Sequence, residues 1–339
     1  MNRAIAYSRH GDASVLELVD QPIAEPGAGE VRIRMAVSGV NPTDWKSRSG
    51  GYGDTISTFT VANQDGAGTV DAVGPGVTGH RVGDRVWVTL AGYGRPASGT
   101  AQELTVVPTE RVFPLPPRAD FELGASVGIP ACTAHRALTV AEDGPTRLNP
   151  GALGGTTVLV SGGAGAVGNA AIQLARWAGG TVVATVSSDE KARLATAAGA
   201  HHVVNYADAD PAEQIRGIAP DGVDLVVEVA AAVNARLDLA VLRSRGTVAI
   251  YGVEGSGQFT PDVGRSLGLN ARYQFVLLYT VGWDRIASAA TDVNRAIEQG
   301  AFGVGEKRGL PLHHYSLDDT PSAHRAVEAG TVGKVLVIV

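Results

Sequence analysis

The sequence predicts a mixed α/β protein in which a small antiparallel β-barrel or sandwich precedes a doubly wound parallel sheet. Three observations predict this fold class. The chain has 339 residues, which is too long for one ordinary hydrophobic core and suits two domains. Short strands separated by Gly and Pro fill roughly the first 130 residues. From about residue 156 the pattern changes to apolar strands that alternate with helical segments.

The first domain is expected to contain short strands that pair antiparallel. Each expected strand is an alternating or β-branched apolar run, and these runs cover 30–40, 66–74, 84–90 and 101–107. Clusters of turn-forming residues separate them, namely EPGAGE, GPGVTGHRVGD and VPTERVFPLPP. Strands at this spacing are typical of an antiparallel barrel or sandwich.

The second domain is expected to contain parallel strands connected by helices. The strands are continuous apolar runs, expected at 157–161, 181–186, 202–204, 223–229 and 246–252. Helical patterns lie between them at 166–178, 187–199 and 231–244. Continuous apolar strands crossed by helices indicate a sheet covered on both faces. The chain then continues with a strand at 271–279, a helix at 284–300 and a last strand at 333–339.

Composition excludes several classes of protein. With 44% apolar residues and a net charge of −6, the chain is expected to be soluble and globular. It has no block of Lys and Arg that would attract nucleic acid. One cysteine, Cys132, cannot form an intrachain disulfide and fits a reducing compartment. No run resembles a signal peptide or a membrane span, so a cytoplasmic location is expected.

A glycine-rich segment follows the strand at 157–161 and opens the helix at 166–178. Its pattern is Gly163-x-Gly165-x-x-Gly168. In this context Gly163 would allow a tight turn, Gly165 would let the backbone approach a pyrophosphate, and Gly168 would let the helix pack closely. The segment therefore predicts a Rossmann dinucleotide site, with a purely structural turn as the alternative. The residues expected to contact the cofactor here are Gly163, Ala164, Gly165, Ala166, Val167 and Gly168.

The end of the second strand of this domain indicates which nicotinamide cofactor is bound. Ser187 and Ser188 stand there, with Lys191 one helical turn further on. Hydroxyl groups and a cation would accept the 2′-phosphate of NADPH, whereas a carboxylate would repel it. The alternative interpretation is a capping box in which Ser187 pairs with Glu190. Asp189 leaves NADH open, because a small backbone shift would turn it toward the ribose.

Five segments together resemble a known family. They are SGVNPTDWKSRSGGY, GAGTVDAVGPGV, VGDRVW, VLVSGGAGAVG and GKVLVIV, and they occur in this order along nearly the whole chain. They are similar to the zinc-free quinone oxidoreductase (zeta-crystallin-like) branch of the medium-chain dehydrogenase/reductase superfamily. The resemblance implies a GroES-like β-barrel catalytic domain at 1–130, an NADP(H)-binding Rossmann domain at 131–275, and a return to the catalytic domain at 276–339.

Zinc catalysis is not expected. Asn41 stands where the zinc-dependent members of the superfamily carry their first cysteine ligand, and ANQDGAG contains neither His nor Glu. A chain with one cysteine cannot build the thiolate-rich tetrahedral sites of those enzymes. Cys132 itself is expected to be a buried small apolar residue, with a reactive thiol as the alternative.

Without a metal ion, hydride transfer to a conjugated acceptor is the easiest reaction of this class. Charge that forms on a quinone or enone spreads over the conjugated system, so ordinary hydrogen-bond donors are sufficient to stabilise it. The amide of Asn41 and the phenol of Tyr52 are the candidate donors, because the resemblance places both beside the nicotinamide. The alternative is an Asn that serves a turn and a Tyr that packs on the surface.

The resemblance implies further cofactor contacts and a partner. The cofactor contacts implied are Thr133, Tyr206, Gly252, Val253, Leu277, Leu278 and Lys334. The apolar strand at 271–279 is expected to be a sheet edge that pairs with a second copy in a homodimer. The long connection at 141–155 is expected to border the substrate cleft. Two other functions stay open: a pathway-specific reductase of enoyl thioesters or specialised metabolites, and an NADPH-binding protein with little turnover.

Overall fold

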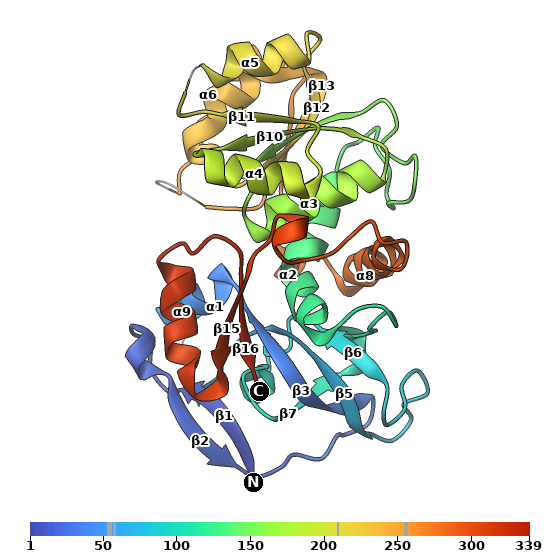
Figure 1. The fold of residues 1–339 in the computed structure, drawn as a ribbon, viewed down its shortest axis with the longest axis vertical. Helices are drawn as coiled ribbons and strands as arrows, with labels where there is room; N and C mark the ends of the chain where they lie inside the picture. Colours follow the sequence, from blue (N-terminus) through green and yellow to red (C-terminus); the bar gives the residue numbers. More distant parts are fainter. Residues whose placement is uncertain (53–55, 57–58, 209, 254–256) are drawn as a thin grey trace. The chain divides into compact units, whose positions relative to one another are not determined.

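The computed structural model describes residues 1–52, 56, 59–208, 210–253 and 257–339 (Figure 1). The chain forms two compact units. The N-terminal unit consists of Met1–Ile129 and Leu312–Val339, and the central unit consists of Pro130–Pro311. The second boundary of the central unit differs from the expected one. Residues 276–311 group with the central unit and not with the first domain.

The N-terminal unit is built on a seven-stranded sheet and a three-stranded sheet. The larger sheet has the order β15-β16-β3-β5-β6-β8, with β7 also paired to β3, and the smaller has the order β2-β1-β4. The bounds are β1 Asn2–Tyr7, β2 Glu17–Gln21, β3 Glu30–Val40, β4 Thr60–Val61, β5 Asp65–Val73, β6 Arg85–Val88, β7 Leu104–Pro108, β8 Val112–Pro114, β15 Leu312–Ser316 and β16 Lys334–Ile338.

The long strand β3 shows why the sequence forms this sheet. Alternate residues of its first half, Val31, Ile33 and Met35, are buried in a cluster of apolar side chains that includes Val70 and Val86. Their neighbours along the strand point the other way, which is the period of two expected for a strand with one buried face. The predicted strand at 30–40 is therefore confirmed as β3.

Three α-helices complete the N-terminal unit within the described residues, and the sequence patterns predicted none of them. Their bounds are α1 Pro42–Arg48, α2 Phe121–Leu138, which runs on into the central unit, and α9 Thr320–Glu328. α1 begins at Asn41 with a proline in its first turn, and Asp44 completes a capping box, so the local signal for this helix was present. α2 is apolar around most of its circumference and lacks a clear amphipathic period. The sequence pattern therefore does not predict this helix.

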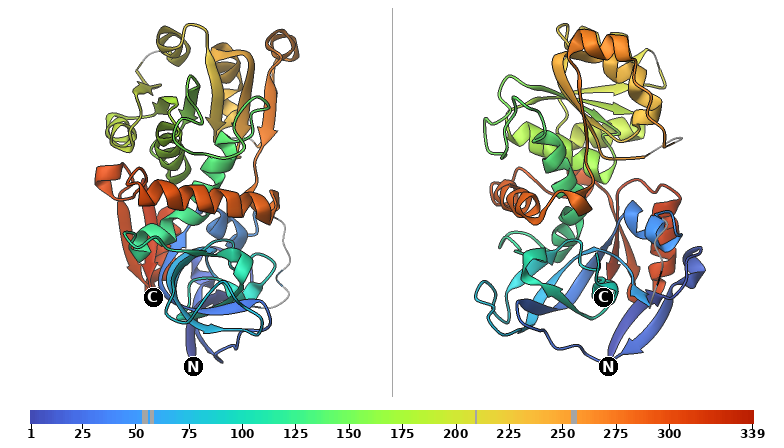
Figure 2. Two further views of the ribbon diagram at one scale, coloured as in Figure 1. Left: turned by 90° about the vertical axis from the view of Figure 1, so that its right-hand side faces the viewer. Right: turned by 180° about the vertical axis from the view of Figure 1, so that it is seen from behind.

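The central unit is a doubly wound sheet of six parallel strands in the order β11-β10-β9-β12-β13-β14. α3 packs with α4 on one face and α5 packs with α6 on the other (Figure 2). The strand bounds are β9 Thr157–Ser161, β10 Thr181–Val186, β11 His202–Asn205, β12 Val223–Glu228, β13 Leu242–Ile250 and β14 Arg272–Phe275. The helix bounds are α3 Ala166–Trp177, α4 Asp189–Ala198, α5 Pro211–Ile218, α6 Ala231–Val241, α7 Val263–Leu269 and α8 Trp283–Glu298.

α8 explains why residues 276–311 belong to the central unit. It packs against α3, and its Asp292 is bonded to residues of the same unit. The edge strand β14 is shorter than the predicted strand at 271–279, because the chain turns into a 3₁₀ helix at Leu278–Thr280. Among the described helices none is long and apolar enough to cross a membrane.

Candidate functional site

In the central unit, the predicted cofactor residues follow strands that all end at one edge of the parallel sheet. Ligands of open α/β sheets bind at this carboxyl edge, near the point where the strand order reverses. Here the order reverses between β9 and β12. The residues at the edge are the glycine loop after β9, Ser187 and Ser188 after β10, Tyr206 after β11, Gly252 and Val253 after β13, and Leu277 and Leu278 after β14. Thr133 lies instead on α2, and Lys334 lies on β16 of the N-terminal unit.

The individual glycines of the loop have partly different structural roles from those predicted. Gly162, rather than Gly163, adopts the left-handed conformation of the turn, with φ of 69°. A Cβ on Gly163 would lie 2.9 Å from the Cβ of Ala184, so this glycine allows close packing on β10. A Cβ on Gly168 would lie 3.0 Å from the Cα of Gly163, which agrees with the predicted close approach of the helix to the loop.

Gly165 leaves the N-terminus of α3 open to an anion. It is the N-cap residue, it makes no side-chain cap, and it is exposed. A Cβ there would meet only the carbonyl oxygen of Gly162, at 3.4 Å, so there is room for a ligand to approach the backbone. The backbone N–H groups of a first helical turn and the helix dipole both favour a phosphate. The geometry of the loop therefore fits a pyrophosphate.

The corner after β10 carries a cation held against a hydroxyl group. Lys191 Nζ donates to Ser187 Oγ at 2.9 Å. The cap of α4 is made by Ser188, whose Oγ accepts from Lys191 N at 3.3 Å. The alternative capping box of Ser187 with Glu190 is therefore wrong, since Lys191 occupies the third helical position. Tyr206 is half exposed, and its N–H donates to the carbonyl of the last residue of β10 at 3.1 Å.

In the N-terminal unit, Asn41 is the centre of a buried polar cluster. It is 1% exposed, and its Nδ2 donates to Asp65 Oδ2 at 2.8 Å. Its Oδ1 accepts from Lys334 Nζ at 2.7 Å, and the same ammonium donates to Val40 O at 3.0 Å. Both amide atoms of Asn41 are thus engaged inside the unit. Asn41 therefore holds this cluster together, and donation of an Nδ2–H to a bound substrate stays a prediction.

Two carboxyl groups complete the cluster. Asp65 also accepts from Thr89 Oγ1 at 2.8 Å and from Ile129 N at 2.7 Å. Asp44 Oδ2 accepts from Asn41 N at 2.6 Å, while its Oδ1 has no donor among the described residues. Burial raises the pKa of both carboxyl groups and lowers that of the Lys334 ammonium. Asp65, which has more donors and faces the ammonium, is the better site for the negative charge.

Lys334 and Tyr52 differ from each other in their access to a ligand. Lys334 is 2% exposed and donates to groups of its own unit, which does not support a contact with the cofactor, and that contact stays an untested prediction. Tyr52 follows α1 and is 49% exposed, which keeps it as the candidate donor to a substrate. Cys132 is fully buried, as its apolar neighbours indicated. Within the described part of the chain, no group of three or more His, Cys, Asp and Glu residues is placed to hold a metal ion.

The connection between α2 and β9 lies away from the nucleotide edge, contrary to the expectation that it borders the cleft. Its Glu142 forms an ion pair with Arg272, and its Asp143 forms one with Arg245 at 2.6 Å. Arg272 begins β14 and Arg245 lies in the first half of β13. Because all six strands are parallel, these contacts attach the loop to the amino edge of the sheet, opposite the glycine loop.

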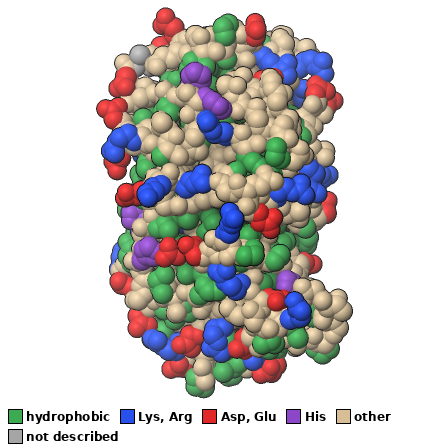
Figure 3. All heavy atoms as spheres, turned by 45° about the vertical axis from the view of Figure 1, so that its right-hand side comes forward, with side chains coloured by type: hydrophobic (Ala, Val, Ile, Leu, Met, Phe, Trp, Pro, Cys, Tyr) green, Lys and Arg blue, Asp and Glu red, His purple; other side chains and the backbone are tan. Residues whose placement is uncertain are grey.

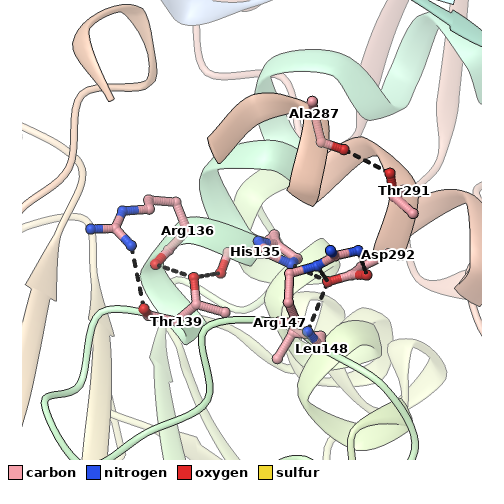
Figure 4. A network of polar contacts seen from close by, with 8 residues as sticks. All are labelled: His135, Arg136, Thr139, Arg147, Leu148, Ala287, Thr291 and Asp292. Atoms are coloured by element: carbon pink, nitrogen blue, oxygen red, sulfur yellow. Dashed lines mark hydrogen bonds and ion pairs between the residues drawn. The ribbon is translucent and has the colours of Figure 1, made fainter. Parts of the chain in front are cut away.

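Asp292 of α8 fixes the other end of this loop (Figure 4). It is 1% exposed and accepts two hydrogen bonds from Arg147, at 2.9 and 2.6 Å. It also accepts from Leu148 N at 2.8 Å and is bonded to His135 Nε2 at 2.8 Å. These donors hold the pKa of Asp292 well below its usual range, although burial alone would raise it. This carboxylate was missed because its partners are about 145 residues distant in the sequence.

The geometry of the two units defines a class of protein. A GroES-like unit combined with a Rossmann unit is the architecture of the medium-chain dehydrogenase/reductase superfamily. Residues 27–117 match the alcohol dehydrogenase GroES-like domain, and residues 166–291 match a family described as zinc-binding dehydrogenase. The chain is 30% identical to a quinone oxidoreductase of Lama guanicoe over 99% of this chain and 97% of that protein.

Solved structures give the same result. A mycobacterial quinone oxidoreductase is 32% identical, with a TM-score of 0.84 and all of both chains covered. The Escherichia coli quinone oxidoreductase complexed with NADPH is 26% identical, with a TM-score of 0.82 and all of both chains covered. The chain belongs to the quinone oxidoreductase branch of the medium-chain dehydrogenase/reductase superfamily. It is an oxidoreductase that binds a nucleotide cofactor.

Proposed function

We propose that the protein is an NADPH-dependent reductase that transfers hydride to a quinone or another conjugated carbonyl compound without a metal ion. The observation that carries the proposal is the corner after β10, where Lys191 Nζ is bonded to Ser187 Oγ and Tyr206 lies on the neighbouring strand end. An ammonium, a hydroxyl and a phenol are donors that a 2′-phosphate can accept from. The exposed Gly165 at the start of α3 suits the pyrophosphate.

Each unit contributes a different part of the chemistry. NADPH, when bound, supplies the hydride. The glycine loop and Lys191 bind its phosphates and so fix its position on the central unit. Tyr52 offers a phenolic donor to the oxygen of the acceptor, while the buried cluster of Asn41, Asp65 and Lys334 holds the start of α1, the helix that precedes Tyr52. A conjugated acceptor spreads the developing charge, so one modest donor is sufficient.

A survey of acceptors tests the proposed function. NADPH absorbance would be followed with quinones, simple enones and enoyl thioesters as acceptors, with and without a chelator. Quinones or simple enones should oxidise NADPH, and the chelator should leave the rate unchanged. Activity confined to enoyl thioesters would favour a pathway-specific reductase. Tight binding of NADPH without turnover of any acceptor would favour a binding protein, and loss of activity with the chelator would contradict the metal-free mechanism.

Lys191→Ala should weaken binding of NADPH about tenfold and leave binding of NADH nearly unchanged. The substitution removes a charge-assisted hydrogen bond to the 2′-phosphate, and such a bond is worth roughly 1.5–3 kcal/mol. Dissociation constants for both nucleotides can be measured by calorimetry. Arg236→Ala removes an exposed cation of α6, on the other face of the sheet, and is the matched control. An equal loss of affinity for both nucleotides would contradict the assignment of Lys191 to the phosphate.

A homodimer formed through the edge of the central sheet is part of the proposal. β14 ends the strand order, so one of its sides has no neighbour within the described sheet. The helix that precedes β14, α7, has no buried residue. Its Leu267 is 72% exposed and its Val263 is 68% exposed. Exposed apolar side chains next to an unpaired strand edge favour association with a second copy. Acidic, basic and hydrophobic side chains are interspersed on the face that Figure 3 shows.

Leu267→Asp should convert the dimer into a monomer at micromolar concentration. A charge placed in an apolar interface loses its hydration without gaining a partner, which weakens association by several kcal/mol. Light scattering after gel filtration measures the mass directly. Val82→Asp changes an exposed apolar residue of the N-terminal unit and should leave the mass as in the wild type. A wild-type protein that elutes as a monomer would reject the dimer.

A further inference from the structure

A buried pair of carboxyl groups lies next to the start of the glycine loop. Glu228 is the last residue of β12 and is fully buried. Asp238 lies on α6, the helix that follows, and is 1% exposed. Neither residue is part of the nucleotide motif, and the groups that contact them in the described part of the central unit include no cation. Two buried carboxyl groups without a cation need an explanation, because both cannot be ionised at low cost.

Glu228 is the member of the pair whose oxygens accept hydrogen bonds. Ser161 Oγ donates to its Oε2 at 2.5 Å, and Ala230 N donates to its Oε1. Asn234 Nδ2 donates to both oxygens, at 3.1 and 3.3 Å. An ionised carboxylate has only acceptor sites, and these three donor groups satisfy them. Ser161 is the last residue of β9 and directly precedes Gly162, so Glu228 connects the end of β12 to the start of the loop.

Asp238 is in the opposite situation. Neither of its oxygens has a donor among the described residues. Burial raises the pKa of Asp238 well above its usual range, and the charge of Glu228 raises it further. Burial and the neighbouring Glu228 favour the protonated form of Asp238, whose O–H is a donor that a carboxylate can accept. Protonation would account for the missing donors of Asp238, because the side chain would then itself be the donor.

The other charged groups near α6 are engaged elsewhere or exposed. α6 packs against β12, β13 and α5. Arg216 of α5 donates to the carbonyls of Ala240 and Pro220, Arg243 pairs with Asp224, and Arg245 pairs with Asp143. Two further charged residues, Glu213 of α5 and Arg236 of α6, are exposed. The pair therefore has no counter-ion other than its own proton in this part of the structure.

We propose that Asp238 and Glu228 hold one proton between them and that this acid–carboxylate pair positions the glycine loop for the nucleotide. The proton keeps Asp238 neutral, so that Glu228 alone carries charge and can order Ser161 Oγ and Ala230 N at the ends of β9 and β12. Both residues act through the backbone that they hold, which makes them positioning residues. The proposal rests on nucleotide binding at this edge, and its first test does not need the nucleotide.

The first test is the pH dependence of stability of the nucleotide-free protein. The folded state binds the proton of Asp238 more tightly than the unfolded chain, so stability contributed by this group falls as pH rises above the unfolded pKa. The Tm of the wild type should fall for this reason as pH rises from about 4, the usual pKa of an unfolded Asp. Asp238→Asn cannot ionise and still donates to Glu228, so its Tm should fall less. Glu213→Gln, at an exposed site, should keep the wild-type slope. Parallel curves for the wild type and Asp238→Asn would overturn the shared proton.

The second test measures binding of NADPH by calorimetry. Glu228→Gln loses the charge that orders Ser161 and should bind NADPH about tenfold more weakly, whereas Asp238→Asn should stay within about twofold of the wild type. Ser161→Ala removes one donor and should weaken binding about threefold, which provides a readout if Glu228→Gln does not fold. Unchanged affinity in Ser161→Ala, or in a folded Glu228→Gln, would overturn the positioning role. A wild type that does not bind NADPH would contradict the proposed function, while the Tm comparison still decides the shared proton.

Discussion

Asp65→Ala is expected to destabilise the N-terminal unit by about 3–5 kcal/mol. The substitution removes the carboxylate whose charge acts most strongly on the buried ammonium of Lys334, and it leaves three donors, on Asn41, Thr89 and Ile129, without an acceptor. Removing one member of a buried charge pair costs more than the pair itself contributes, because the remaining charge stays out of water. Urea unfolding followed by circular dichroism measures the loss.

Asp318→Ala is the matched control for Asp65→Ala. Asp318 forms an ion pair with Arg3 in the same unit, at 2.5 Å, but its side chain is largely exposed. An exposed pair of this kind contributes at most about 1 kcal/mol. The double variant Asp65→Ala, Lys334→Met should recover part of the lost stability, since it removes the unpaired charge. Equal stability of Asp65→Ala and the wild type would show that the cluster is not held by charge.

Asp292→Asn is expected to destabilise the central unit by about 3–5 kcal/mol at neutral pH. The change removes the charge that accepts two hydrogen bonds from Arg147 and one each from Leu148 and His135. It should also release the loop that α8 holds, so that proteases cleave between α2 and β9. Arg147→Ala should cost less, because the Arg147 side chain is 45% exposed and water replaces part of what it loses.

The pH dependence of stability gives Asp292 a second signature. Its folded pKa lies below its unfolded value of about 4, so its contribution is fully present above that value. As pH falls toward the folded pKa, the unfolded chain takes up a proton that the folded protein does not, and stability is lost. Asp292→Asn should therefore lose less stability than the wild type between about pH 5 and about pH 3. An equal loss of stability in the wild type and in Asp292→Asn over this pH range would contradict the low pKa of Asp292.

Local patterns predicted the strands well, because their signal lies in consecutive residues. The predicted strands at 157–161 and 181–186 agree with β9 and β10, since a fully buried parallel strand is a continuous apolar run. The helix patterns also placed α3 and α4 within a few residues of their observed ends. The glycine motif lies between β9 and α3 as predicted, although the turn falls on Gly162 and not on Gly163.

The contacts that sequence patterns missed are long-range. Lys334 and Asn41 are 293 residues apart, and nothing in their local sequence indicates that one accepts a hydrogen bond from the other. Glu228 and Asp238 look like ordinary polar residues of a strand end and a helix, because their significance depends on burial. Asp44 alone gave a local signal, as the third residue after the helix-capping Asn41. The roles of Asn41 and Lys334 were assigned by resemblance to a family. A resemblance shows which positions correspond, but it does not show which groups surround each side chain in this protein.

The position of β16 in the larger sheet has a consequence for synthesis of the chain. β16 lies between β15 and β3, and Lys334 is bonded to Val40, which is 294 residues earlier. On the ribosome, β3 emerges long before β16 and meanwhile has one side without its final neighbour. The central unit, whose six strands all come from one continuous segment, can fold first. β3 is thus among the last strands to complete its native pairing, and chaperones that shield open sheet edges should act on it during that interval.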